Sequence, residues 1–434
     1  MELNLAQFSK ACRPYEPLDV SKADQRPYYI DLSSVRGNKI LEALRRPIVR
    51  LYTDEPTCQL FTGHIGCGKS TELLYLKALL EKDDFHVVYM ESRRHVELED
   101  ADISDILLAI AGQVSASLEA SGINIKPSYL MRLIQEVVEI LKAPVEIETN
   151  AKFSFLIAEI TTTTKSSPQV RPRFREHVEP RTKLILDSIN NELLTPAIAQ
   201  LKAKGKQGLV AIVDDLDRIE NRLHPTGQLR PEYLFVTRAD QLSRLKCHVI
   251  YTIPLILTFS NYIETIRNRF GQPQILPMVP VTLRNGSLCE PGIALLRQMV
   301  LSRAFPQKHP VNRMDLVTEV FDSAETLDRL CCVSGGHARN LMILLYECLR
   351  RSDPPFARSQ LESVIQSYRN TLTTSITTDE WALLRRVAQD KSLAGEQEYE
   401  TALKSLYVFE YQYQGDRWYD VNPVLQEAPQ FQQP

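Results

Sequence analysis

The chain has 434 residues, of which 44% are hydrophobic and 24% charged, a composition typical of soluble globular proteins with two or three domains. Its 51 basic and 54 acidic residues give a net charge of −3, which excludes the overall basic excess that marks many nucleic-acid-binding proteins. No signal peptide, membrane-length apolar run or CxxC pair is visible, so we expect a soluble cytoplasmic protein with reduced thiols.

The first part of the chain predicts the start of a parallel sheet. Residues 1–27 are polar and contain prolines, which predicts a loosely packed arm, and a helix follows over 39–46. A short buried strand at 58–62, a helix at 70–82 with leucines on one face, and a strand at 86–90 come next. Strand, loop, helix and strand make a βαβ unit, which requires parallel strands and a right-handed crossover.

The middle of the chain predicts further helices and an insertion. Apolar periodicity predicts a helix over 102–118 and another over 129–141. The threonine-rich run at 161–168 reads as an exposed loop or linker, and we take about 121–176 as an insertion. One long helix or two follow over 178–204 and end at a Lys-Gly-Lys-Gln-Gly stop.

The second half predicts two more strands and a helical region. The strands are expected at 208–214 and 249–253. Helices are expected at 293–304, 315–321, 325–333 and 338–351. The last block, 377–434, predicts two helices followed by a β-hairpin around Gly415-Asp416.

The segment Gly63 to Ser70 has the pattern Gly-x-x-x-x-Gly-Lys-Ser of a phosphate-binding loop. Its glycines let consecutive backbone N–H groups face a phosphate, Lys69 reaches the β- and γ-phosphates, and the Ser70 hydroxyl ligates Mg²⁺. A glycine loop that merely turns is the plainer reading, but a strand before and a helix after the loop favour nucleotide binding. The residues expected to hold the nucleotide are Gly63, His64, Ile65, Gly66, Cys67, Gly68, Lys69, Ser70 and Thr71.

Acidic residues follow the apolar strand at 208–214. Asp214 is expected to hold Mg²⁺ together with Ser70, because the carboxyl ends of parallel strands meet at one edge of a sheet. Asp215 is expected to orient or deprotonate the attacking water, and Asp217 is a second candidate for that role. The alternative is a solvated strand end followed by a helix cap.

Two further features carry weaker signals. Thr252, at the end of the strand at 249–253, is a candidate contact for the γ-phosphate or the water, although a threonine at a strand end is commonly only structural. Arg267 and Arg269, on a short helix, are candidate arginine fingers that would reach a neighbour's γ-phosphate in an assembly. Surface arginines on a solvated helix are the equally weighted alternative.

The segment Gly335-Gly336-His337-Ala338-Arg339 begins a helix in the region after the sheet. Arg339 at that helix start is a candidate for folding back onto the γ-phosphate and reporting its presence. The alternative is an exposed arginine at a helix start.

Together these motifs resemble the AAA+ and STAND superfamily of P-loop ATPases over roughly residues 28–350. The segment Ser334 to Arg339 is similar to the sensor-2 motif of initiator-type AAA+ proteins, and Arg267 to Phe270 resembles their arginine-finger box. The Asp-Asp-Leu-Asp-Arg run is similar to that of STAND and KAP-type NTPases, although KAP proteins usually carry transmembrane helices. A guanine-reading Asn/Thr-Lys-x-Asp motif is not found, which favours ATP.

The resemblance implies an α/β fold: a P-loop NTPase parallel sheet flanked by helices, a helical lid and a small winged-helix-like domain. The domains expected from it are an arm at 1–27, an ATPase core at 28–285 with the insertion at about 121–176, a lid at 286–370 and a winged-helix-like domain at 371–434. Lys69 and Asp214 lie 145 residues apart, which supports the insertion. Asp215 stands where the family usually has Glu, so hydrolysis is expected to be slow or to rely on Asp217.

These expectations leave several functions open. The first is a nucleotide-driven switch that assembles with ATP and signals to a protein partner. The second is a DNA-associated ATPase, whose basic surface would come from residues such as Arg171, Arg173 and Arg175. Residues 377–434 carry five basic and ten acidic residues, which opposes DNA binding by that block. A nucleotide-binding scaffold with little hydrolysis is the third, and a small-molecule kinase is the weakest.

Overall fold

The computed structural model describes residues 3–37, 39–141, 152–393 and 398–433. The chain forms two compact units that are interleaved along the sequence. The first unit consists of Met1–Ile40, Gly63–Tyr75 and Ile275–Pro434, and the second of Leu41–Thr62 and Leu76–Gln274. The phosphate loop therefore belongs to the same compact unit as the predicted lid and the C-terminal block.

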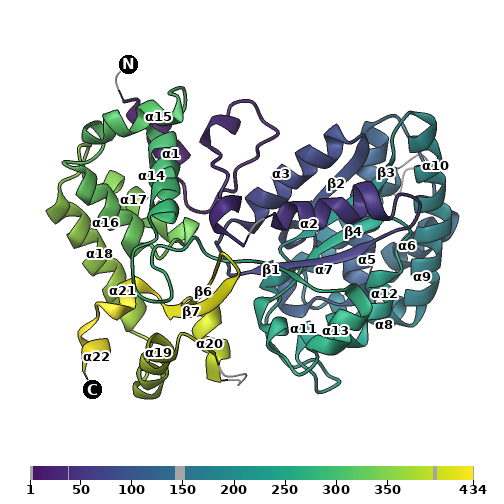
Figure 1. Ribbon diagram of the computed structural model, residues 1–434. Coiled ribbons are helices and arrows are strands. Elements are labelled where there is room, and N and C mark those ends of the chain that lie inside the picture. The colour runs from purple at the N-terminus through teal and green to yellow at the C-terminus, as the bar shows by residue number, and fades with distance from the viewer. Residues whose placement is uncertain (1–2, 38, 142–151, 394–397, 434) are drawn as a thin grey trace. The chain divides into compact units, whose positions relative to one another are not determined.

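A five-stranded sheet has the order β2-β3-β4-β1-β5. Figure 1 labels β1 to β4. Its strands are β1 (Cys58–Gly63), β2 (Phe85–Glu91), β3 (Gly208–Asp214), β4 (His248–Thr252) and β5 (Gln274–Leu276). β3 runs parallel to both β2 and β4, and β4 runs parallel to β1, so these four strands end at the same edge. Every residue of β3 and β4 is buried, as expected for strands covered on both faces. The predicted parallel sheet is confirmed, and β5 is a strand that the sequence did not reveal.

Helices lie around the sheet of the second unit (Figure 1), and most of them share one apolar core with it. They are α2 (Ile40–Arg46), α3 (Lys69–Lys82), α4 (Ser92–His95), α5 (Ile103–Ala120), α9 (Thr182–Ser188), α10 (Thr195–Ala203), α12 (Ala239–Ser243) and α13 (Ile263–Phe270). Asp102 caps α5, because its side chain accepts the Ile103 N–H while Asp105 accepts the Asp102 N–H. Among the described residues, α5 is long and apolar enough to cross a membrane, but two thirds of it is buried, as in the core helix of a soluble protein.

The expected insertion is largely helical where the structure describes it. It contains α6 (Ser128–Leu141), α7 (Phe153–Ser166) and the start of α8 (Arg171–Val178). The interpretation of 161–168 as an exposed loop is wrong, since α7 continues through Thr161 and Thr164, and both are buried. Their hydroxyls donate to backbone carbonyls three or four residues earlier, which satisfies these polar groups inside the helix.

The first unit has its own core, built mainly from the predicted lid. Its helices are α14 (Glu290–Ala304), α15 (Pro310–Arg313), α16 (Ala324–Val333), α17 (Ala338–Arg351) and α18 (Arg358–Thr373). Part of the N-terminal segment is packed: α1 (Leu5–Ala11) contacts α14, and Phe8 and Cys12 are fully buried in this core. Residues 13–27 are mostly exposed or half-buried. Burial of the Phe8 side chain contributes about 1.5–3 kcal/mol toward ordering α1.

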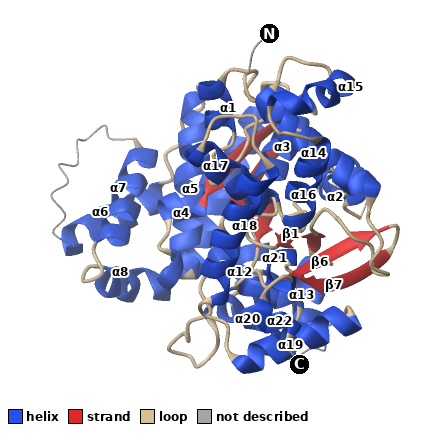
Figure 2. Ribbon diagram, turned by 90° about the vertical axis from the view of Figure 1, so that its left-hand side faces the viewer, coloured by secondary structure: helices blue, strands red, loops and turns tan. Residues whose placement is uncertain are grey.

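The C-terminal block has the predicted order of helices and hairpin. Helices α19 (Thr378–Asp390) and α20 (Glu398–Lys404) precede the antiparallel strands β6 (Val408–Tyr413) and β7 (Asp416–Val421), which Figure 2 shows in red. Two short helices, α21 (Pro423–Gln426) and α22 (Pro429–Gln432), close the chain. The arrangement is compatible with the winged-helix-like domain that the sequence predicts.

Candidate nucleotide-binding site

The phosphate loop follows β1 directly and runs into α3. Gly66 and Gly68 have φ values of +88° and +109°, which side chains rarely adopt, so the curl of the loop depends on glycine at both positions. The Cys67 N–H donates to the His64 C=O at 3.2 Å and closes the turn. The first N–H groups of α3 lack partners within the helix by construction, so the helix start is suited to a phosphate.

Lys69 is 5% exposed, and its ammonium group bonds to the loop itself. Nζ donates to the carbonyl oxygens of Gly63 at 2.9 Å and His64 at 2.8 Å. The loop thus holds a buried cation against its own backbone, beside a helix start. These residues fit a nucleoside triphosphate, because a bound phosphate would give the buried ammonium group a strong anionic partner.

The sequence did not indicate Arg36, which supports the loop from the N-terminal segment. Its Nη2 donates to the Cys67 C=O at 2.9 Å, and the side chain is fully buried. Burial lowers the pKa of Arg36, while Cys67, Glu72 and Tyr29 oppose that shift. The Tyr29 hydroxyl donates to Glu72 Oε2 at 3.2 Å. A single arginine outside any motif gives no sequence signal. The role of Arg36 is recognised only from its buried contact with the loop in the structure.

The predicted sensor segment lies against the phosphate loop. His337 Nε2 donates to the Ile65 C=O at 2.8 Å, and the Arg339 backbone N–H donates to the Gly66 C=O at 3.2 Å. A Cβ on Gly66 would lie 2.8 Å from His337 Nε2, so the approach is as close as glycine allows. The Arg339 guanidinium carbon lies 5.7 Å from the centroid of the Tyr15 ring. The segment and the loop are therefore in contact, and the γ-phosphate role of Arg339 stays a prediction.

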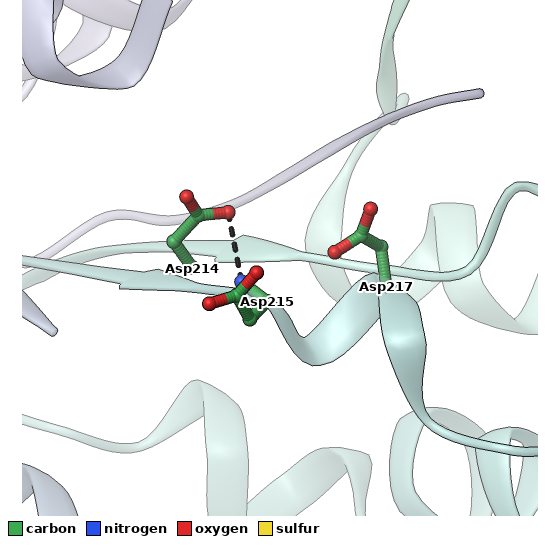
Figure 3. Close-up of side chains that lie close together, drawn as sticks. All are labelled: Asp214, Asp215 and Asp217. Atoms are coloured by element: carbon green, nitrogen blue, oxygen red, sulfur yellow. Dashed lines mark hydrogen bonds between the residues drawn. The ribbon is translucent and has the colours of Figure 1, made fainter. Parts of the chain in front are cut away.

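Three carboxylates gather at the end of β3 and in the turn after it (Figure 3). Asp214, Asp215 and Asp217 each offer an oxygen within 4.8 Å of the others. Asp214 Oδ1 accepts the Asp215 N–H at 2.8 Å, and its Oδ2 accepts the Tyr89 hydroxyl at 2.6 Å. Oxygen ligands at this spacing suit a hard cation such as Mg²⁺. The roles of Ser70 and Asp214 as Mg²⁺ ligands stay predictions.

Asp215 is buried between opposing charges. Its carboxylate oxygens lie 3.1 Å from Arg93 Nε and 2.9 Å from Arg218 Nε. Burial and the neighbouring Asp214 raise the pKa of Asp215 to about 6, while Arg218 and Arg93 act in the opposite direction. A carboxylate with a pKa near that of the medium is suited to accept a proton from water. The contact with Arg93 was not predicted, since nothing in the sequence pairs these two residues.

Thr252 lies fully buried at the end of β4, and its hydroxyl is engaged with the backbone after and within β3. Oγ1 accepts the Leu216 N–H at 3.0 Å and lies 3.4 Å from the Val213 C=O. In these contacts Thr252 braces the turn that carries Asp215. A direct contact with phosphate or water stays a prediction, and it would require this hydroxyl to exchange partners.

The two candidate arginine fingers lie on α13 and are about half exposed. Arg267 pairs with Glu264 on the same helix, and Arg269 pairs with Asp240 of α12. Both arginines thus have acidic partners in their own chain, and neither pair is buried deeply enough to be costly to open. A role at a neighbour's nucleotide stays a prediction.

The arginines suggested as a DNA-facing surface are largely committed to ion pairs. Arg171 and Arg175 both pair with Asp100, at 3.5 and 2.8 Å, and Arg175 also pairs with Asp105. These contacts attach α8 to the start of α5 and neutralise most of the charge in that cluster. Arg173 remains exposed.

No protein-family model and no curated protein matches the chain. Among solved structures, it is similar to a Walker-type ATPase of Pyrococcus abyssi, with 13% identity over 92% of this chain and 98% of that one and a TM-score of 0.41. It is also similar to the Aeropyrum pernix ORC2 protein in ADPNP and ADP complexes (11%, 96% and 95%, 0.39) and to the ORC1 protein of the same organism in complex with DNA (14%, 89% and 92%, 0.37). The fold assignment rests on the strand order of the sheet and on the phosphate loop.

Proposed function

We propose that this chain is an ATP-binding switch that hydrolyses ATP slowly and passes its nucleotide state to a partner. The observation that supports this most is the bonding of the phosphate loop to the segment that begins α17. Ile65 and Gly66 accept hydrogen bonds from His337 and Arg339. A movement of the loop on nucleotide binding would therefore be transmitted directly to the start of α17.

The proposed roles follow the chemistry of each group. Lys69 and the N–H groups of Gly63 to Thr71 bind the phosphates, and Ser70 and Asp214 are the proposed Mg²⁺ ligands. Mg²⁺, when bound, neutralises charge on the β- and γ-phosphates. Asp215 accepts the proton of the attacking water, with Asp217 as the second candidate. Asp215 is one methylene shorter than the usual Glu, which fits a slow reaction.

The switch is proposed to act through assembly in the cytoplasm. Arg339 contacts the γ-phosphate within one protomer, and Arg267 or Arg269 reaches the nucleotide of a second copy. The output is contact with a protein partner, because the C-terminal block is acidic and suits a basic protein surface better than a phosphate backbone.

A direct test combines nucleotide binding, turnover and light scattering on the wild type and on Lys69→Ala. We expect the wild type to bind a fluorescent ATP analogue, to hydrolyse ATP and to increase in mass with ATP but not with ADP. Lys69→Ala should lose all three properties, because it removes the cation that reaches the phosphates. A wild type that neither binds nor hydrolyses ATP would refute the proposal.

Two alternatives are separated by simple controls. The first alternative is a DNA-associated ATPase, and the ORC1 structure named above contains DNA. Such an ATPase would bind duplex DNA with an affinity that falls steeply as the salt concentration rises. A scaffold would bind ATP without measurable turnover, and Asp215→Asn would then leave its nucleotide-dependent mass unchanged. If the wild type binds DNA in a salt-dependent way and Lys69→Ala does not, the result would favour the DNA-associated ATPase over the switch.

A further inference from the structure

The C-terminal hairpin is hydrogen-bonded directly to the phosphate loop. The Glu410 backbone N–H, in β6, donates to Nε2 of His64 at 3.0 Å, although the two residues lie 346 positions apart. The Glu410 C=O accepts the Met278 N–H at 2.9 Å. His64 is only 2% exposed, so water does not compete for its ring nitrogen. We call the bond between His64 and Glu410 the latch.

The ring of Phe409 extends the latch to the sensor segment. Its centroid lies 6.0 Å from that of His64, edge to face, and 5.6 Å from that of His337, with the rings nearly parallel. A Cβ on Gly335 would lie 2.6 Å from the Phe409 ring, and the Tyr411 hydroxyl donates to the Gly335 C=O at 2.9 Å. β6 therefore contacts the phosphate loop and the sensor segment together.

The hydrogen bonds assign opposite tautomers to the two histidines. A backbone N–H can only donate, so Nε2 of His64 must be the acceptor, and the proton lies on Nδ1. In His337, Nδ1 accepts the Asn340 N–H at 3.1 Å, and Nε2 donates to Ile65. Burial lowers the pKa of His64 to about 3 and that of His337 to about 4. Both rings stay neutral at physiological pH, so protons do not open the latch there.

Lys69 connects the latch to nucleotide binding. Its ammonium group holds the C=O of His64, while the His64 ring holds the hairpin. A phosphate in the loop would draw the ammonium toward itself, because an anion is a stronger partner than a carbonyl oxygen. The His64 peptide would then lose its charge-assisted hydrogen bond with Lys69. Without that bond, the backbone of His64 would no longer hold its ring in the orientation that accepts the Glu410 N–H.

We propose that His64 couples nucleotide binding to the hairpin: occupation of the loop opens the latch and loosens β6–β7. The inference rests on the proposed nucleotide binding. Coupling between two equilibria is reciprocal, so breaking the latch must strengthen nucleotide binding by the same factor. Typical couplings correspond to about 5-fold or more in affinity.

The first test follows backbone hydrogen exchange in peptides that cover β6 and β7 of the wild-type protein. Saturating ATP analogue with Mg²⁺ should speed the exchange of these amides, including that of Glu410, by about 5-fold or more. Exchange in α18 serves as the internal reference. Unchanged or slower exchange in β6–β7, with nucleotide shown to be bound, would overturn the latch.

The second test uses three variants and a fluorescent ATP analogue. His64→Phe keeps a buried ring but removes the acceptor, so it should bind nucleotide about 5-fold more tightly and show fast hairpin exchange without nucleotide. His64→Gln places an amide oxygen where Nε2 lies, so it should bind nucleotide less tightly than His64→Phe and should keep the slow hairpin exchange. Gln414→Ala, at the exposed hairpin turn, is the matched control and should behave as wild type.

The outcomes separate the latch from the proposed function. If the wild type binds no nucleotide, the proposed function fails and takes the latch with it. If the wild type binds nucleotide and His64→Phe binds it with the same affinity as His64→Gln, the latch is refuted while the proposed function stands. The exchange experiment on the wild type decides the matter even if His64→Phe does not fold.

Discussion

At the scale of single residues, the surroundings of Asp215 set the pH range in which hydrolysis is expected. Burial and Asp214 raise its pKa to about 6, and Arg218 and Arg93 oppose the shift. Because a carboxylate must be ionised to accept a proton, turnover should rise with pH through about 6 and then level off. Arg93→Gln removes a cation that favours ionisation, so the rise should move to higher pH.

The measurement is steady-state ATPase activity between about pH 5 and 8. Asp215→Asn, which has no titrating group at this position, should lose the rise altogether. The raised pKa of Asp215 also affects the stability of the folded state, which should fall with pH over the range in which turnover rises. Since the folded value lies above the unfolded one, Asp215 favours the folded state below about pH 4 and loses that contribution as the pH rises through about 6. Identical profiles for the wild type and Arg93→Gln would show that Asp215 is not the titrating base.

Thr252 offers a second prediction at this scale. Its hydroxyl accepts the N–H of Leu216, which is buried, so Thr252→Val should lower the free energy of unfolding by about 1–3 kcal/mol. Thr252→Ser keeps the hydroxyl oxygen, so it should lower the free energy of unfolding by less than Thr252→Val does. Urea unfolding monitors both variants. If Thr252→Val is as stable as the wild type but does not hydrolyse ATP, Thr252 acts on the nucleotide rather than as a brace.

At the scale of elements, the sequence predicted four strands and most of the helices, but not β5 or the helical state of the threonine-rich run. β1, β2, β3 and β4 are short apolar runs bounded by turns, and local composition alone identifies such runs. The helical state of Thr161 and Thr164 is set by burial and by hydroxyl bonds to the backbone, against a low intrinsic helix propensity. Tertiary contacts of this kind have no local signal.

In the candidate site too, the sequence predicts the residues that belong to local motifs but not the contacts between distant parts of the chain. Lys69, Asp214 and Arg339 belong to segments with a recognisable spacing, and the structure keeps Lys69 in the loop and Arg339 at the helix start beside it. Arg36 contacts the loop from 31 positions away, and the latch joins residues 346 positions apart. Contacts at such separations depend on how the chain folds back, and a single sequence does not encode them in any local pattern.

The approach of α5 to α7 gives a prediction about elements. A Cβ on Gly112 would lie 2.7 Å from Cγ2 of Ile157, so Gly112→Ala forces the two helices apart. Alanine adds up to about 1 kcal/mol of helix propensity, but the overlap costs about 1–3 kcal/mol, so a net loss of stability is expected. Ile157→Leu removes the branched methyl, and the double variant should recover most of the loss. Additive losses in urea unfolding would contradict the close packing of these helices.

At the scale of the whole molecule, the two compact units divide the proposed machinery between them. The first unit carries the phosphate loop, the sensor segment and the hairpin, and the second carries the acidic cluster and the candidate arginine fingers. Each part alone performs only part of the proposed reaction: one binds phosphates, the other supplies the base.

Assembly between copies is tested by complementation. Arg267→Ala keeps the phosphate loop but lacks one candidate finger, and Lys69→Ala keeps the finger but lacks the phosphate-binding cation. If Arg267 acts on a neighbour's nucleotide, each variant alone should be nearly inactive, and a mixture of the two should regain ATPase activity in the mixed assemblies. The regain should depend on protein concentration, because it requires two chains to meet.

The matched variant for this experiment is Arg269→Ala, on the same helix two positions further along. Arg267 and Arg269 pair with different acidic partners, Glu264 and Asp240, so each substitution opens one ion pair and leaves the other in place. Only the arginine that reaches the neighbour should produce an inactive variant that Lys69→Ala rescues. If both single variants hydrolyse ATP at the wild-type rate, the arginines are surface residues and the site is complete within one chain.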